Sequence, residues 1–388
     1  MRIVAGVVLI ALTQAVCAAE IIPPQPDATE FHFVVLGDAQ FDDPPAFNRL
    51  VDQARRLRPA FVIQVGDLIE GYNSNLDVVS AEWARFRKQV APLAPIRYLP
   101  VPGNHDTFGS NKKPDAALER LFEETWGPLH YAFEYQNALF VILNSDARGA
   151  MNSIRGKQLT WLRETLESSQ AAHKFAFMHR PPFLMRNAEP LHELFRDSGV
   201  SHVFYGHHHH YHYFELDGVH YSMTNAAGDS VNDQPLVGGF DHLLQVAVRG
   251  EEVSVAVIAA DAVKAQDSVA PADNYDYFSL SRGLLPDTVA LRETGQGVYE
   301  MPVTLSNTAR REVRVYLSCT SSDERWSFTP RQLQPLELAA GSDHTVAIVA
   351  SYAPDRIPES APVCHARVPL QTAAGQWLDL HLSVEGER

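Results

Sequence analysis

Five short groups of polar residues draw attention because their side chains are typical ligands of divalent metal ions. In chain order they are Asp38-Ala39-Gln40, Gly66-Asp67, Gly103-Asn104-His105-Asp106, His179 and Gly206-His207-His208-His209. Carboxylate oxygens, amide oxygens and neutral imidazoles together suit Mn, Fe or Zn. Each group alone is weak, because a Gly-Asp pair is usually a turn and an Asn-His pair usually lies in a loop. Five such groups in one chain predict a metal site.

Apolar runs that are typical of short buried strands precede these groups. The runs cover residues 31–36, 60–65, 96–101, 139–143, 174–178 and 200–205,. Apolar residues at helical spacing predict helices over 47–57 and 158–166. Strands that alternate with helices predict a layered α/β core. Because ligands bind at the carboxyl ends of strands in such sheets, the five groups are placed for one shared site.

The order of the five groups resembles the pattern of the calcineurin-like metallophosphoesterases. That pattern is Asp-x-His, Gly-Asp, Gly-Asn-His-Asp/Glu, a separate His, and Gly-His-x-His, and its five blocks fall between residues 37 and 209 here. The resemblance implies a four-layer αββα fold, with two facing sheets and helices on both outer sides. It also implies an enzyme that hydrolyses phosphate esters with a hydroxide bridging two divalent metal ions.

The resemblance also implies how the ligands divide between the two ions. The first ion is expected to bind Asp38, Gln40, Asp67 and His209. The second ion is expected to bind Asp67, Asn104, His179 and His207. Asp67 belongs to both sets, and one carboxylate between two dications lowers their mutual repulsion.

His105 and Asp106 are the expected catalytic residues. By resemblance, His105 points toward the leaving group and acts as a general acid or as a stabilising cation. We expect the Asp106 carboxylate to accept a hydrogen bond from the second ring nitrogen of His105.

Two positions depart from the patterns of the family and its relatives. Gln40 stands where the first block usually has His, so a neutral oxygen replaces an imidazole nitrogen and the first ion should be held less tightly. The alternative is a degraded first site, in a protein that binds metal or a partner without turnover. Purple acid phosphatases carry a Tyr three residues after the Gly-Asp aspartate, and Glu70 occupies that position here. We therefore expect no tyrosinate–iron centre.

Other polar residues are weaker candidates. We expect His208 and His210 to be peripheral to the metals, although they belong to a histidine run. Possible substrate contacts are Arg180, Asn144, Asp146, Arg148 and an overhanging loop at residues 72–79. The expected substrate is a small phosphate ester, with a slight preference for a phosphodiester. The alternatives are a phosphomonoester and a nucleotide.

Composition and the N-terminus limit the classes of partner and compartment. The chain has 388 residues, a formal charge of −15 and a pI near 5.5, which argues against broad nucleic-acid binding,. Residues 1–19 read as a cleaved signal peptide, because Arg2 precedes an apolar stretch too short to span a bilayer. We therefore expect a periplasmic or secreted protein without a stable membrane span.

The chain is long enough for two domains. We predict a catalytic domain over residues 20–262, a linker over 263–290 and a small all-β sandwich over 291–388. This sandwich resembles immunoglobulin-like accessory modules that bind a surface or a partner. Removal of residues 1–19 leaves Cys319 and Cys364, which either pair in an oxidising compartment or remain buried thiols,.

Overall fold

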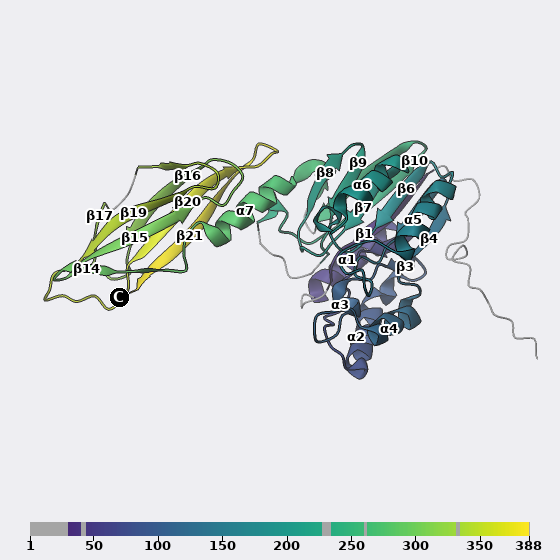
Figure 1. Ribbon diagram of the computed structural model, residues 1–388, viewed down its shortest axis with the longest axis horizontal. Helices are drawn as coiled ribbons and strands as arrows, with labels where there is room; N and C mark the ends of the chain where they lie inside the picture. The colour runs from purple at the N-terminus through teal and green to yellow at the C-terminus, as the bar shows by residue number, and fades with distance from the viewer. Residues whose placement is uncertain (1–29, 40–43, 227–233, 260–261, 331–333, 388) are drawn as a thin grey trace, which may run out of the picture.

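The computed structural model describes residues 30–39, 44–226, 234–259, 262–330 and 334–387. Gln40 and the predicted signal peptide lie outside these residues. Figure 1 shows an α/β unit, a β-rich C-terminal unit, and helix α7 (Pro271–Gly283) between them. No helix in the described part of the chain has both the length and the apolar character that a membrane span requires.

The first sheet of the α/β unit carries three of the polar groups. Its strand order is β12 (Val263–Ala265), β11 (Glu252–Ala259), β10 (His242–Arg249), β1 (Glu30–Leu36), β2 (Phe61–Gln64), β3 (Arg97–Pro100). Strands β1, β2 and β3 are parallel, so their carboxyl ends meet at one edge,. The helices packed on its outer face are α1 (Pro44–Leu57), α2 (Leu76–Val90) and α4 (Ala116–Trp126).

The second sheet carries the remaining two polar groups. Its strand order is β4 (Tyr131–Tyr135), β5 (Ala138–Ile142), β6 (His173–Phe177), β7 (Val200–Tyr205), β9 (Val219–Met223), β8 (His212–Leu216). Strands β5, β6, β7 and β9 run parallel to one another. The helices packed on its outer face are α5 (Lys157–Ser168) and α6 (Ala188–Asp197).

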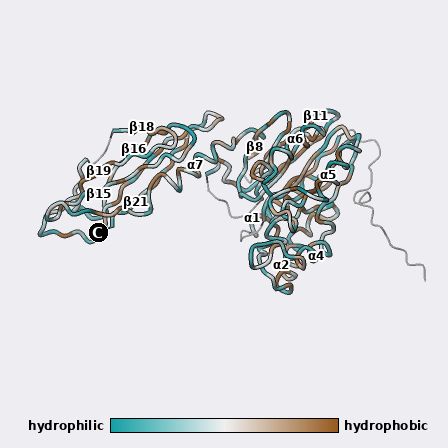
Figure 2. The backbone as a smooth tube through the Cα atoms, viewed as in Figure 1, coloured by the Kyte–Doolittle hydropathy of each residue, from teal (hydrophilic) through white to brown (hydrophobic). Residues whose placement is uncertain are grey.

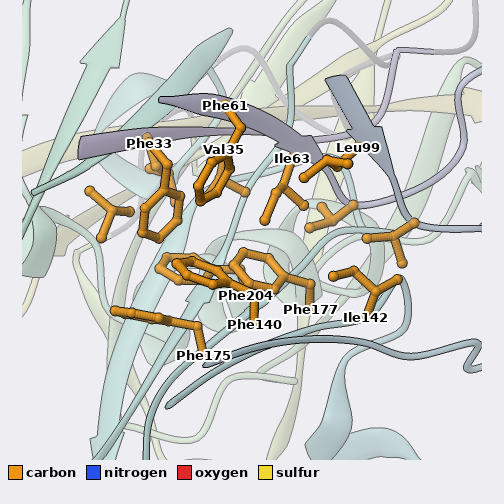
Figure 3. Packing of buried hydrophobic residues seen from close by; sticks show 14 of the residues in the cluster. Phe33, Val35, Phe61, Ile63, Leu99, Phe140, Ile142, Phe175, Phe177 and Phe204 are labelled. Atoms are coloured by element: carbon orange, nitrogen blue, oxygen red, sulfur yellow. The ribbon is translucent and has the colours of Figure 1, made fainter. Parts of the chain in front are cut away.

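The inner faces of the two sheets enclose one aromatic core (Figure 3). Phe33 and Phe61 of the first sheet meet Phe140 of the second edge to face, with ring centroids 5.2 and 5.0 Å apart. Such pairs contribute roughly 0.5–1.5 kcal/mol beyond the apolar area that they bury. Helices, sheet, sheet and helices form the four-layer fold that the sequence predicted. This core holds together the two sheet edges that are formed by the carboxyl ends of the strands.

The C-terminal unit is a β-sandwich. One sheet has the order β13 (Thr288–Ala290), β21 (Trp377–Glu387), β20 (Val363–Gln371), β16 (Val313–Thr320), β18 (Leu336–Leu338). The other has the order β14 (Arg292–Gly295), β15 (Val298–Ser306), β19 (Asp343–Ser351), β17 (Ser327–Thr329). Hydrophilic and hydrophobic residues alternate along these strands (Figure 2), which places one side chain in two in the shared core,.

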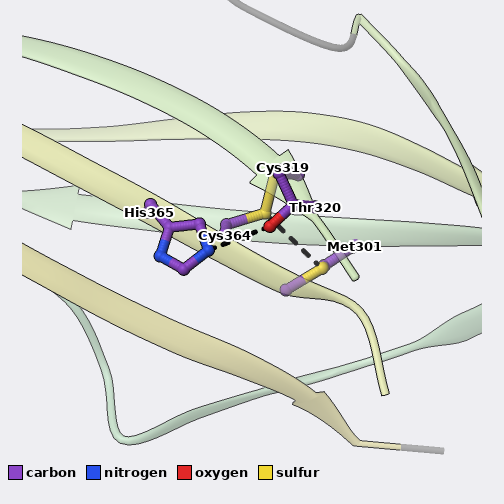
Figure 4. Close-up of a disulfide and its surroundings, with 5 residues drawn as sticks. All are labelled: Met301, Cys319, Thr320, Cys364 and His365. Carbon is purple, nitrogen blue, oxygen red and sulfur yellow. Dashed lines mark hydrogen bonds between the residues drawn. A yellow bond between two sulfur atoms is a disulfide. The ribbon is translucent and has the colours of Figure 1, made fainter. Parts of the chain in front are cut away.

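Cys319 and Cys364 form a disulfide (Figure 4). They face each other on the paired strands β16 and β20, within one sheet. The disulfide of antibody domains joins the two sheets instead, so this bond differs from the immunoglobulin arrangement. The sulfur of Met301 packs 3.8 Å from Cys364 Sγ in the buried interior.

Residues 263–290, which we predicted to be a linker, form regular structure instead. Strand β12 extends the first sheet of the α/β unit, and helix α7 packs between the two units. The Asn274 amide donates to the carbonyl oxygen of Val237, and the Asp273 carboxylate accepts from the backbone nitrogen of Ala373. Because α7 buries mainly polar side chains, it lacks the apolar periodicity that signals a helix in sequence,.

Candidate metal centre

The described residues of the five groups converge where the carboxyl ends of the two sheets face each other. Asp38 follows β1, Asp67 follows β2, and the short helix α3 (Asn104–Thr107) follows β3. From the other sheet, His179 follows β6 and His207 follows β7. The side chains of Asp38, Asp67, Asn104 and His179 are buried. This convergence agrees with the position that the sequence predicted.

The first cluster of ligand atoms surrounds the Nε2 atom of His179. This atom lies 3.0 Å from Asp67 Oδ2, 2.9 Å from Asn104 Oδ1 and 3.1 Å from His207 Nδ1. The other ring nitrogen of His179 donates to the carbonyl oxygen of Val65 at 2.9 Å. That hydrogen bond fixes the ring so that Nε2 faces the cluster, as is usual for metal-binding histidines.

A second cluster contains Asp38, Asp67 and His209. The Nε2 atom of His209 lies 3.4 Å from Asp38 Oδ2, and the backbone nitrogen of His207 donates to the Asp38 carboxylate at 3.0 Å. In each cluster, the carboxylate and imidazole ligand atoms lie within 4.8 Å of one another, and Asp67 belongs to both. Asp67 is thus common to both clusters, and the division of ligands between two ions stays a prediction.

Close approach of carboxylates requires glycine at two positions. A Cβ atom on Gly103 would lie 2.2 Å from Asp67 Oδ1, and one on Gly206 would lie 2.1 Å from Asp38 Oδ1. Asp67, His207 and His209 also have left-handed backbones, with φ of 52°, 79° and 52°. Strained backbones at non-glycine residues are typical of functional sites. The glycines in Gly-Asn-His-Asp and Gly-His-x-His therefore have a steric reason.

The buried carboxylates dominate the electrostatics of the cluster. Burial lowers the pKa of His179, but the adjacent Asp67 carboxylate outweighs it and raises the pKa to about 9,. Burial raises the pKa of Asp67, and positive His179 overcomes this effect, so the net shift is downward. Burial, with the charges of His179 and Arg180, lowers the pKa of His207 to about 2. The centre therefore combines the ionised Asp67 carboxylate and the neutral His207 imidazole with a protonated His179, whose proton a divalent ion must displace,.

The expected hydrogen bond between His105 and Asp106 is replaced by a different arrangement. The Nδ1 atom of His105 donates to the carbonyl oxygen of Glu70 at 2.5 Å. The Asp106 carboxylate instead accepts from the backbone nitrogens of Gly103, Asp67 and Leu68, at 2.8–3.0 Å. Asp106 occupies the third position of α3, where a carboxylate folds back to cap the helix,. Our prediction for Asp106 was therefore wrong: it fixes the loop that carries Asp67.

Tyr72 belongs to the predicted overhanging loop and contacts two residues of the centre. Its hydroxyl accepts from the Asn104 side-chain nitrogen at 2.6 Å, which leaves Asn104 Oδ1 directed at His179. Its ring lies against His105, with centroids 4.1 Å apart. One indication of this role was present in the sequence, namely the position of the loop shortly after Asp67.

Of the weaker candidates, Arg180 and Asp146 reach the centre. The Nε atom of Arg180 donates to Asp146 at 2.6 Å, and its Nη1 atom lies 2.9 Å from His207 Nε2. Asn144 and Arg148 have other roles: Asn144 Oδ1 accepts from the Asp146 backbone, and Arg148 pairs with Glu119.

The two remaining histidines of the run bond to neighbouring residues. His210 Nδ1 donates to the carbonyl oxygen of His208, and its Nε2 atom lies 3.2 Å from His212 Nδ1. Among the described residues, neither metal-ligand group includes His208 or His210. Their position agrees with the peripheral role that we expected.

Comparison with protein families agrees with this geometry. The model of the calcineurin-like phosphoesterase family matches residues 31–211, which include every residue of both ligand groups. Residues 31–211 therefore resemble a calcineurin-like phosphoesterase domain.

Curated relatives that match about half of the chain are named serine/threonine-protein phosphatase CPPED1. The rat protein is 27% identical over 213 residues, an alignment that covers 49% of this chain and 64% of the relative. The human protein is 24% identical over 248 residues, which cover 53% of this chain and 77% of the relative. The chain thus spans less than two thirds of the length of the rat relative.

Solved structures similar to the domain have low sequence identity. A dimetal phosphatase from Danio rerio is 16% identical with a TM-score of 0.48, covering 61% of this chain and 99% of that one. A structure of PhoD is 13% identical with a TM-score of 0.48, covering 63% of this chain and 72% of that one.

The residues of the two ligand groups fit two divalent ions. Asp38, Asp67 and His209 offer two carboxylates and an imidazole to one ion. Asp67, His179 and His207 offer a carboxylate and two imidazoles to the other, and Asn104 Oδ1 lies beside them. Mixed oxygen and nitrogen ligands of this kind suit Mn, Fe or Zn. Gln40, the remaining predicted ligand, lies outside the described residues.

Proposed function

We propose that the phosphoesterase domain hydrolyses small phosphate esters with two divalent metal ions. The observation that carries this proposal is the pair of ligand groups that share Asp67. Two ions held there would supply a bridging hydroxide as nucleophile at neutral pH and neutralise charge on the phosphoryl oxygens. The ligand assignments, including Gln40 for the first ion, belong to this proposal.

His105 is the general acid in this proposal. Its Nδ1 proton is held by the Glu70 carbonyl oxygen, which can only accept, so Nε2 is the atom that gives up a proton,. The backbone nitrogen of His105 also donates to Asp67 Oδ1 at 2.9 Å. The backbone of His105 is therefore held against the Asp67 carboxylate. In this proposal, Nε2 of His105 delivers its proton to the oxygen of the leaving group.

For the substrate, we place a phosphomonoester first and the predicted phosphodiester second. The names of the curated relatives, serine/threonine-protein phosphatases, support a phosphomonoester. The preference for a diester came from the absence of purple-acid features and from the nucleotides and lipid head groups common among periplasmic substrates. Neither argument rests on a contact of this site.

The test compares initial rates on p-nitrophenyl phosphate and bis(p-nitrophenyl) phosphate, with metal-stripped protein reloaded with Mn²⁺. We expect metal-dependent turnover with a higher kcat/KM for the monoester. A higher value for the diester would reverse our ranking. Metal binding without turnover of either ester would instead favour the alternative of an impaired site, with Gln40 as its cause.

We also propose that the protein is periplasmic or secreted. The disulfide between Cys319 and Cys364 supports an oxidising compartment,. Mass spectrometry of protein from the native host would show a mature N-terminus near residue 20. An uncleaved N-terminus in the cytoplasm would contradict the proposal. A binding role for the C-terminal sandwich stays a prediction.

A further inference from the structure

Arg180 lies beside the ligand group formed by Asp67, His179 and His207. Its Nη1 atom is 2.9 Å from His207 Nε2, and its Nη2 atom is 3.4 Å from Asn104 Oδ1. The side chain is only 18% exposed. Both terminal nitrogens of the guanidinium are therefore directed at the residues that would hold the second ion.

Asp146 fixes the orientation of this guanidinium. Both oxygens of the buried Asp146 carboxylate accept from Arg180 Nε, at 2.6 and 2.8 Å. The neighbouring Ser145 hydroxyl accepts from the Arg180 backbone nitrogen at 3.1 Å. Because the guanidinium is planar, an anchor at Nε also sets the directions of Nη1 and Nη2.

Metal coordination would remove the present acceptors of Arg180. The Nδ1 atom of His207 faces the ligand cluster, and its Nε2 atom faces Arg180. A neutral imidazole that coordinates through Nδ1 carries its proton on Nε2, so it cannot accept from Arg180. Asn104 Oδ1 would be a ligand as well. The terminal N–H groups of a largely buried cation would then need other acceptors.

We propose that Arg180 donates hydrogen bonds to the free oxygens of the substrate phosphate, and that Asp146 is its positioning residue. The fork of an arginine matches two oxygens of one phosphate group. A terminal phosphate offers three free oxygens and up to two negative charges, whereas a diester offers two and one. Because a phosphomonoester carries the higher negative charge, the cationic Arg180 favours phosphomonoesters over phosphodiesters. This inference rests on the proposed function and names its substrate class.

The experiment measures binding of inorganic phosphate to Mn²⁺-loaded protein by isothermal titration calorimetry, with metal content determined on the same samples. Arg180→Gln should keep both ions and bind phosphate about 10- to 100-fold more weakly, because charge-assisted hydrogen bonds are lost. The phosphate affinity of Arg180→Lys should lie between those of the wild type and Arg180→Gln, because lysine keeps the charge without the planar fork of donors. Arg163→Gln, at an exposed arginine on helix α5, is the matched control.

Asp146→Asn tests the positioning role. It should weaken phosphate binding in the wild-type background and have no further effect in the Arg180→Gln background, because the two residues act as one unit. An equal loss in both backgrounds would show that Asp146 acts independently of Arg180.

Kinetics provide the second readout. Arg180→Gln should lower kcat/KM for p-nitrophenyl phosphate by at least tenfold more than for bis(p-nitrophenyl) phosphate. Unchanged phosphate affinity in Arg180→Gln, or loss of a metal ion from it, would overturn the inference. If Arg180→Gln does not fold, unchanged phosphate affinity in Arg180→Lys would overturn it. Failure of the wild-type protein to hydrolyse either ester would refute the proposed function, while phosphate binding would still decide the role of Arg180.

Discussion

The Nδ1 atom of His105 donates to the carbonyl oxygen of Glu70 across 2.5 Å, so a backbone group fixes the ring of the proposed acid. The adjacent carboxylate of Asp106 is engaged by three backbone nitrogens instead. A carbonyl oxygen can only accept, which leaves Nε2 as the proton-exchanging atom. The roles of these two adjacent residues can therefore be separated by mutation.

His105→Ala should retain both metal ions and lower kcat by about 10²- to 10⁴-fold, the usual contribution of a general acid. The loss should be smaller for p-nitrophenyl phosphate than for phenyl phosphate, because p-nitrophenolate leaves without protonation. Steady-state kinetics and metal analysis check both statements. Loss of metal from this variant would show that His105 is needed for metal binding.

Asp67→Asn should lose both ions, whereas Asp38→Asn should lose one, because, among the residues that the structure describes, Asp67 alone belongs to both ligand groups. Metal content per chain, measured by mass spectrometry after dialysis, distinguishes the two variants. Equal stoichiometry in both would argue against a shared carboxylate.

Metal affinity should fall by about tenfold for each pH unit below pH 9, because one proton on His179 competes with the ion. The Asp67 carboxylate overcomes the effect of burial and raises the pKa of His179 to about 9, so this proton is bound throughout the neutral range. Calorimetry at pH 7.5 in buffers of different ionisation enthalpy should show proton release when Mn²⁺ binds. Proton uptake, or affinity independent of pH, would contradict the prediction.

Tyr72→Phe should weaken binding of the second ion by about 10- to 100-fold, the usual cost of losing a hydrogen-bond partner of a ligand. The Tyr72 hydroxyl accepts from the Asn104 amide nitrogen and keeps Oδ1 directed at His179. Competition with a metal chelator measures the change, and Tyr275→Phe, at an exposed tyrosine of α7, is the control. If both variants bind metal like the wild type, the hydroxyl of Tyr72 has no such role.

Replacing both Cys319 and Cys364 by alanine should destabilise the C-terminal sandwich by about 4 kcal/mol, the loop-entropy estimate for a sequence separation of 45 residues,. The α/β unit has its own core, so we expect kcat not to change. Thermal unfolding followed with and without reductant measures the stability. A parallel loss of activity in folded protein would show that the two units are coupled.

The layered α/β fold and the order of the candidate ligands could be predicted from the sequence for a physical reason. Polar residues at strand ends can be recognised in a sequence, because an apolar run must stop where Asp38, Asp67 or His179 begins,. The six predicted strands all exist, with ends displaced by at most one residue. Helix α7 was missed because its buried face is polar and therefore gives no apolar periodicity.

Only the tertiary structure decided which partners these residues have. Arg180 and Asp146 are 34 residues apart, and His105 and Glu70 are 35 apart. Such pairs form where the ends of different strands meet. No local sequence pattern determines which donor bonds to which acceptor there. The sequence thus determined the residue types and their order. The packing of the two sheets determined that Glu70 holds His105, that Asp106 caps α3, and that Arg180 faces the metal ligands.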